Sequence, residues 1–241
     1  MSDAQKYTSK LHGQRILIIG GTSGIGYAVA EASLEHGANV IISSSSPPAS
    51  TLPSPPSANS THPPPPPATR TASGDIPATS PPPTLLAQAC PAEEEKLDHI
   101  VFTAGNRLAI GALKDISLDA IHTAGQVRFA GPLLLAKLAH PRYLAPGPRS
   151  SITLTTGVVS EKPIADWALN GGYGAGLHGV MRGLALDLRP VRVNLVSPGL
   201  VETELWDSLK ESSGGAWEGM VGKWVGKMTT GVVGRVEDVA E

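Results

Sequence analysis

Residues 15–26 constrain the fold of this chain more than any other stretch. They read Arg-Ile-Leu-Ile-Ile-Gly-Gly-Thr-Ser-Gly-Ile-Gly, an apolar run that enters a glycine-rich turn, and a helix-like segment follows at 27–32. Gly20 allows a sharp turn after a strand, Gly24 allows the backbone to approach a pyrophosphate, and Gly26 allows close packing of helix on strand. The helix N-terminus offers N–H groups and a positive dipole end to phosphates. This order predicts the first βα unit of a dinucleotide-binding fold rather than an ordinary glycine-rich loop.

Length and charge narrow the possible classes of protein. The 241 residues fit one α/β domain spanning 1–241, and the balance of 19 basic against 21 acidic residues argues against a nucleic-acid partner. No apolar run approaches the roughly 20 residues of a membrane span, and the first ten residues lack the apolar core of a signal peptide. The single cysteine, Cys90, excludes an internal disulfide and a cysteine-based metal site. We therefore expect a cytoplasmic protein without a metal.

Strand and helix patterns alternate along most of the chain, which predicts a parallel sheet with helices on both faces. Short apolar runs mark the expected strands, and Gly37 marks the end of the first helix. Longer periodic stretches mark the expected helices. The expected strands are 16–19, 39–42, 97–102, 151–155 and 191–196, and the expected helices are 27–36, 115–140 and 173–188.

Residues 47–91 break this alternation. They hold 15 of the 22 prolines and only two charged residues, Arg70 and Asp75. Proline donates no ladder hydrogen bond and interrupts helices, so we expect a Pro-rich, low-complexity, irregular segment in place of the third strand. A second interpretation starts from the 34 residues among these 45 that are Pro, Ala, Ser or Thr. Because codons for these four amino acids mostly carry cytosine in the middle position, a GC-rich gene read in a shifted frame would give this composition.

Several motifs together resemble the short-chain dehydrogenase/reductase family. Besides the glycine turn, they are Thr103-Ala104-Gly105 after the fourth strand, Gly131-Pro132 in a long helix, and 193–199 (Val-Asn-Leu-Val-Ser-Pro-Gly) followed by Thr203. The resemblance implies a single Rossmann-like, doubly wound parallel sheet that binds NAD(H) or NADP(H). It also implies pairing through helices 115–140 and 173–188 into dimers or tetramers. The chain stops where the family's penultimate helix begins, so we expect the last strand to be missing and the sheet edges to be exposed.

The resemblance places the cofactor along these motifs. After the second strand, NAD-dependent members usually carry an acidic residue, whereas this chain has serines at 43–46. Without a carboxylate to repel the 2′-phosphate, NADP(H) is favoured over NAD(H). The implied cofactor-binding residues are Gly20, Thr22, Ser23, Gly24, Ile25, Gly26, Ser43, Ser44, Ser45, Ala104, Gly105, Pro198, Gly199, Val201 and Thr203.

The catalytic residues depart from the family pattern, which uses a tyrosine, a lysine four residues later, a serine and an asparagine. Tyr173 is the obvious tyrosine, but Leu177 follows at the lysine position. An alternative register, anchored on residues 179–182, puts Asn170 and Gly174 in the two positions, and neither register supplies a lysine. Thr156 matches the serine, although Ser160 has the more typical spacing of 13 residues before Tyr173. The asparagine is replaced by Arg128, for which Asp166 is the nearest candidate partner.

These departures resemble fungal reductases of secondary metabolism that act on an iminium and also guide a Diels–Alder cyclisation. We expect an NADP(H)-dependent oxidoreductase that reduces a carbonyl or iminium of a bulky metabolite, with Tyr173, Thr156, Arg128 and Asp166 at its site. An iminium already carries positive charge, so hydride delivery to it needs no proton donor. The alternatives are a cofactor-binding cyclase or regulatory protein without redox turnover, and a defective gene product of low solubility.

Overall fold

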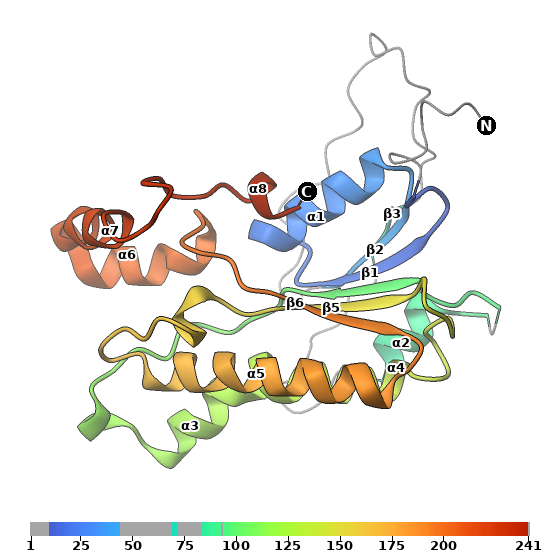
Figure 1. Ribbon diagram of the computed structural model, residues 1–241, viewed down its shortest axis with the longest axis horizontal. Helices are drawn as coiled ribbons and strands as arrows, with labels where there is room; N and C mark the ends of the chain where they lie inside the picture. The colour runs from blue at the N-terminus through green and yellow to red at the C-terminus, as the bar shows by residue number, and fades with distance from the viewer. Residues whose placement is uncertain (1–9, 44–68, 72–82, 93, 241) are drawn as a thin grey trace, which may run out of the picture.

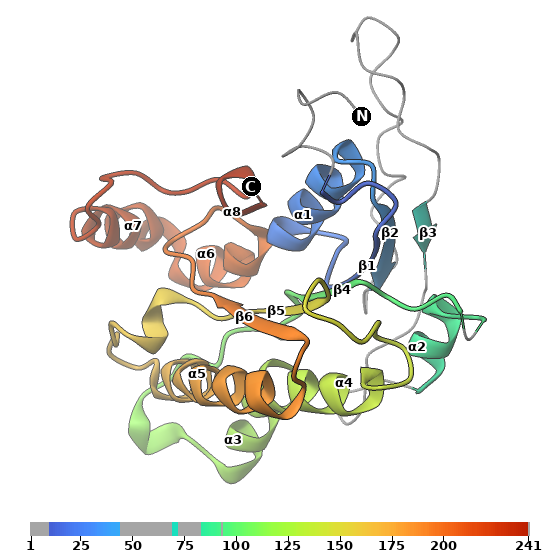
Figure 2. The same cartoon turned by 45° about the vertical axis from the view of Figure 1, so that its right-hand side comes forward.

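The computed structural model describes residues 10–43, 69–71, 83–92 and 94–240. Its centre is the parallel sheet of Figure 1, and the strand order β3-β2-β1-β4-β5-β6 can be followed in Figure 2. The order reverses between β1 and β4, and ligands of open α/β sheets bind at such a switch point. The strands are β1 (Arg15–Ile19), β2 (Asn39–Ser43), β3 (Thr69–Thr71), β4 (His99–Phe102), β5 (Ser151–Thr155) and β6 (Arg192–Val196).

Helices cover both faces of the sheet, as a parallel sheet requires. Helices α1 and α8 lie on one face, α2, α3, α4 and α5 lie on the other, and α6 and α7 lie beyond the carboxyl end of β6 (Figures 1 and 2). The helices are α1 (Gly24–Glu35), α2 (Pro83–Ala89), α3 (Leu118–Gly125), α4 (Gly131–Ala139), α5 (Ala168–Asp187), α6 (Asp207–Ser213), α7 (Trp217–Val225) and α8 (Glu237–Ala240). Short helical turns are η2 (Leu113–Asp115), η3 (Gln126–Ala130), η4 (Val158–Ser160), η5 (Glu204–Trp206) and η6 (Gly214–Ala216).

The strands are held by burial on both sides. Successive side chains of β1 alternate between faces: Ile16 and Ile18 join a small apolar cluster with α1, whereas Leu17 joins a larger one with α2, α4 and α5. Ile18 and Leu17 are completely buried. The continuous apolar run that predicted this strand therefore reflects a central strand covered on both faces.

Two described elements fall inside the proline-rich segment. Strand β3 pairs in parallel with β2, with Val40 opposite Thr69, at the edge of the sheet. Helix α2 begins at Pro83, where the missing N–H of proline costs nothing, and it buries Leu85 and Leu86 in the core. The expectation of an irregular segment in place of the third strand was therefore wrong for residues 69–71, and the expectation that 47–91 sustains no helix was wrong for residues 83–89. The remainder of that segment, at 47–68 and 72–82, and with it the frameshift hypothesis, lies outside the described residues.

The expected helix at 115–140 is divided. Helix α3, capped by the Ser117 hydroxyl, which accepts from Ala120 N at 3.1 Å, runs into the π-helical turn η3 and then α4. The expected helix at 173–188 begins five residues earlier, at Ala168. Within the described part of the chain, β6 is the last strand at one edge of the sheet. None of the helices described is long and apolar enough to cross a membrane.

Candidate functional site

The glycine turn after β1 is as tight as its sequence suggests. Gly20 has a φ of +90° and its N–H donates to the Ser43 carbonyl at 2.7 Å. A Cβ at Gly20 would lie 2.7 Å from Ala104 N, and a Cβ at Gly26 would overlap the Gly20 carbonyl oxygen. The Thr103 hydroxyl lies 3.2 Å from that same oxygen. Only glycine fits at these two positions, so the ends of β1 and β4 form one compact unit.

The amino end of α1 faces the segment after β6. A Cβ on Gly24, which has a φ of +51°, would lie 3.2 Å from Thr203 Cγ2 and 3.4 Å from Glu204 Oε2. Ser23 precedes the helix without a side-chain cap hydrogen bond, and the first helical turn carries no acidic residue. The turn and Thr203 are therefore neighbours, as a pyrophosphate cradle requires, while the exposed Glu204 carboxylate lies at its entrance.

The other expected cofactor residues gather at the same carboxyl edge of the sheet. Ser43 ends β2, but its side chain is fully buried and its hydroxyl has no hydrogen-bond partner. Ser44 and Ser45 lie outside the described residues. The Pro198 carbonyl accepts from Val158 N at 2.9 Å, which ties the segment after β6 to the one after β5. Thr22 and Ile25 lie in the first turn, Ala104 and Gly105 follow β4, and Pro198, Gly199 and Val201 follow β6.

Arg128 lies in the π-helical turn η3 and reaches across to the end of β4. Its Nη2 donates to the Asn106 carbonyl at 2.6 Å, and a Cβ on Gly105 would overlap its guanidinium. Its Nε is buried without a partner. Burial lowers the pKa of the guanidinium, which still stays charged because arginine starts so high. A buried cation with an unused donor is suited to an electron-rich ligand group.

Asp166 does not pair with Arg128. No carboxylate among the described residues forms a salt bridge with this guanidinium, and burial accounts for the shift of its pKa, which corrects the expected pairing. Asp166 is an exposed residue with a φ of +65°, held where its carbonyl accepts from Gly111 N at 2.9 Å. A positive φ is unusual for a residue other than glycine. Asp166 lies in the loop that precedes α5.

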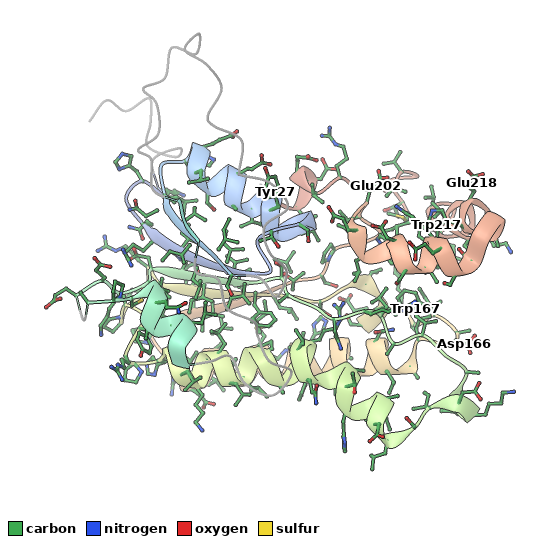
Figure 3. All side chains as sticks on the ribbon, turned by 180° about the vertical axis from the view of Figure 1, so that it is seen from behind. Tyr27, Asp166, Trp167, Glu202, Trp217 and Glu218 are labelled. Carbon is green, nitrogen blue, oxygen red and sulfur yellow. The ribbon has the colours of Figure 1, made fainter. Side chains whose placement is uncertain are left out.

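Next to Asp166 stands a cluster of four tryptophans that the sequence did not indicate. Trp167 is buried, and its ring lies 6.1 Å from that of Trp206 and 6.2 Å from that of Trp224. Trp217 completes the cluster, 6.0 Å from Trp206, and Figure 3 shows it on α7 above Trp167. No residue of α6 or α7 is fully buried, so these rings hold the α6–α7 lobe to the body of the protein.

Helix α5 presents Asn170 and Gly174 at the site, four residues apart on one face. The Thr156 hydroxyl donates to the Gly174 carbonyl at 3.2 Å, and a Cβ on Gly174 would lie 2.9 Å from Thr156 Oγ1. Asn170 bonds the backbone of Ala109. This placement favours the register in which Asn170 and Gly174 occupy the family's tyrosine and lysine positions.

Tyr173 takes a different direction. Its hydroxyl donates to the Ile121 carbonyl of α3 at 2.8 Å, its ring packs 5.6 Å from that of Phe129, and a Cβ on Gly125 would overlap the ring. The structure thus directs this phenol toward α3 rather than to Thr156, because Tyr173 stands about 100° round the helix from Gly174. This corrects the expectation that Tyr173 belongs to the site.

A glycine turn at the switch point of a parallel sheet, with Thr203 facing it, defines a Rossmann-type dinucleotide-binding protein. Residues 7–241 match the family described as an SDR-like Rossmann domain. The chain belongs to the short-chain dehydrogenase/reductase family, whose Rossmann fold binds a nicotinamide cofactor. Its described residues include no cluster of three potential metal ligands.

Fungal proteins are among its relatives. It is 43% identical to the short-chain dehydrogenase/reductase fsr5 of Gibberella fujikuroi, over 100% of this chain and 91% of that protein. It is 38% identical to the short-chain dehydrogenase/reductase malC of Malbranchea aurantiaca, over 100% of this chain and 90% of that one. The structure of the MalC reductase/Diels-Alderase from that organism superposes with a TM-score of 0.79 at 37% identity, covering 97% of this chain and 89% of that one.

Proposed function

We propose that this chain is an NADP(H)-dependent reductase that acts on a carbonyl or iminium carbon of a bulky secondary metabolite. The observation that carries the proposal is the meeting of the glycine turn, Thr203 and the buried guanidinium of Arg128 at one edge of the sheet. The similarity to a structure named as a reductase and Diels-Alderase supports a reductase.

The residues present fit a dinucleotide. Gly20 and Gly26 pack so closely on the backbone around Ala104 that the turn has no room for side chains at these positions. Gly24 and Thr203 would hold the pyrophosphate. When bound, the dihydronicotinamide supplies the hydride. The serines at 43–46 place no carboxylate after β2, which supports NADP(H) over NAD(H).

Three side chains would act on the substrate. Arg128 would stabilise negative charge that develops on a substrate oxygen, because its guanidinium is buried without a carboxylate. Thr156 would orient that oxygen if its hydroxyl turned from the Gly174 carbonyl, to which it donates at 3.2 Å. Asp166, exposed beside the tryptophan cluster, would favour a cationic centre such as an iminium.

The test is stoichiometric consumption of the cofactor. The purified chain is mixed with NADPH or NADH and with a bulky quinone or a cyclic iminium, and oxidation of the dinucleotide is followed together with the reduced product. We expect one product per NADPH oxidised, deuterium transfer from NADPH labelled at C4, and weaker turnover with NADH. Product formation without oxidation of either dinucleotide would contradict the proposal.

A cyclase without redox turnover is the second candidate, and one observation favours it. Asn170 and Gly174 stand where the family's proton-transferring tyrosine and lysine would be, so the usual machinery for carbonyl reduction is replaced. This candidate predicts that a diene substrate cyclises faster in the presence of the chain, with NADPH neither consumed nor required in stoichiometric amount.

Members of this family are commonly oligomeric, and we propose that this chain pairs through α3, α4 and α5. These helices carry the exposed residues Leu118, Leu133 and Leu186, which are 66%, 37% and 62% accessible. Light scattering coupled to size exclusion tests this. We expect a dimer or tetramer, and dissociation on Leu186→Glu; a monomeric wild type would contradict the pairing.

A further inference from the structure

Ser160 and His178 form a hydrogen-bonded pair beside the candidate site. Neither side chain belongs to the proposed function described above. Ser160 ends the turn η4, which follows β5, and His178 lies on α5. Ser160 Oγ and His178 Nε2 are 3.0 Å apart, and the pair is partly buried. Such a pair can pass a proton from the imidazole to the hydroxyl.

The pair adjoins Thr156 through Gly174. Gly174 lies one helical turn before His178, on the same face of α5. The Cβ that Gly174 lacks would lie 2.9 Å from Thr156 Oγ1 and 3.2 Å from Ser160 Cβ. Thr156 and Ser160 therefore both border the position that the family's lysine would occupy, and His178 is hydrogen-bonded to Ser160.

A carboxylate lies near the imidazole, and solvent reaches the ring. Glu161 Oε1 lies 3.8 Å from His178 Nε2, and solvent screens any attraction between the two groups because the Glu161 side chain is 60% accessible. The His178 side chain is 25% accessible, so water can return a proton to it. Among the described residues, the salt bridges of this ring involve Glu161 alone.

We propose that Ser160 is the proton donor for carbonyl reduction and that His178 is the positioning residue that reprotonates it. The inference rests on the proposed function. Hydride from NADPH adds two electrons to the carbonyl carbon and the C=O π bond breaks. The oxygen takes the proton of the Ser160 hydroxyl as that hydroxyl takes one from the imidazolium of His178. The products are the alcohol, NADP⁺ and neutral His178, which then regains a proton from water.

The experiment compares two substrates, because only one needs a proton. Phenanthrenequinone is the carbonyl probe and N-methyl-dihydroisoquinolinium is the iminium probe, each mixed with the full chain and NADPH in single-turnover measurements. We expect His178→Gln, which keeps a hydrogen bond to Ser160 but carries no mobile proton, to slow quinone reduction about 100-fold with an unchanged half-saturating quinone concentration. Iminium reduction by this variant should stay within about twofold of wild type, since it consumes no proton. Added imidazole should restore quinone reduction in His178→Ala.

The controls separate a chemical role from a structural one. His122→Gln alters an exposed histidine of α3 and should leave both rates unchanged. Ser160→Ala should match His178→Gln, and the two together should cost no more than either alone. Equal slowing of both probes, or full quinone reduction by His178→Gln, would overturn the inference while the proposed function stands. A wild-type chain that binds NADPH and reduces neither probe would overturn both.

Discussion

Asn170 holds the backbone of Ala109 with both ends of its amide. Its Oδ1 accepts from Ala109 N at 3.2 Å, and its Nδ2 donates to Ala109 O at 2.9 Å. Gly111 N donates to the Asp166 carbonyl a few residues away, so the loop after β4 is joined to the start of α5 at three points. Asn170 thus ties the loop after β4 to the start of α5.

Asn170→Ala should loosen that connection. It removes two hydrogen bonds and leaves the polar groups of Ala109 without these partners, so we expect a loss of about 1–3 kcal/mol in the free energy of unfolding. Urea titration measures the loss, and KM for the bulky substrate should rise in parallel. Asn39→Ala is the matched control, because Asn39 makes one exposed bond to the Gly13 carbonyl. Equal effects of the two substitutions would contradict the role of Asn170.

Glu204→Gln should strengthen cofactor binding. The Glu204 carboxylate lies near Gly24, where the pyrophosphate would bind, and like charges repel. Because Glu204 is exposed, we expect a gain of only about threefold in NADPH affinity at low salt, vanishing near 1 M salt. Fluorescence titration of NADPH measures it. Glu211→Gln, a substitution at an exposed residue of α6, should have no effect. An unchanged Kd for Glu204→Gln would show that Glu204 does not lie close enough to the pyrophosphate to repel it.

Arg128→Met should separate stability from activity. The guanidinium is buried with one hydrogen bond and no carboxylate, so an apolar replacement of similar length removes a desolvated charge at little structural cost. We expect a thermal midpoint equal to or above that of the wild type, and a fall in kcat/KM of about 100-fold or more. A variant that unfolds at a much lower temperature would show that Arg128 is structural, and full activity would exclude it from the site.

The sequence predicted the centre of this fold well and its periphery less well. The glycine turn and the apolar strands follow from local rules, because buried parallel strands and βα turns allow few residue types. Helix α2 was missed because its prolines outweighed Leu85 and Leu86, whose burial depends on tertiary contacts. Tyr173 was misplaced since two registers of one helix fit the motif spacing, and the direction of the phenol is decided by packing on Phe129. The tryptophan cluster could not be predicted, because its residues are far apart in the sequence and come together only in the folded structure.

Acidification should destabilise the protein through His99. Burial lowers the pKa of this imidazole from 6.5, and the nearby Arg192 lowers it further against the opposite effect of Asp98. The unfolded chain therefore binds the proton more readily than the folded one below pH 6.5. Stability is present above 6.5 and is lost as the pH falls toward the lower folded pKa. Urea unfolding between pH 7 and 5 should show this slope, and His99→Gln should reduce it, whereas His122→Gln should not.

Restoring a lysine at position 174 should fail to restore ordinary family chemistry. Any Cβ there would lie 2.9 Å from Thr156 Oγ1 and 3.2 Å from Ser160 Cβ, and the Thr156 hydroxyl is held on the Gly174 carbonyl at the end of β5. We expect Gly174→Ala to cost about 1–3 kcal/mol through overpacking, and Gly174→Lys to cost at least as much. Gly179→Ala, on the same helix in open space, is the matched control and should stabilise slightly. Since the crowding comes from Thr156 and Ser160, Thr156→Ala should relieve part of the cost of Gly174→Ala in the double variant. Urea unfolding of the wild type, the two single variants and the double variant measures this. Strict additivity of the two changes would show that Gly174 is not the contact that closes this position to a side chain.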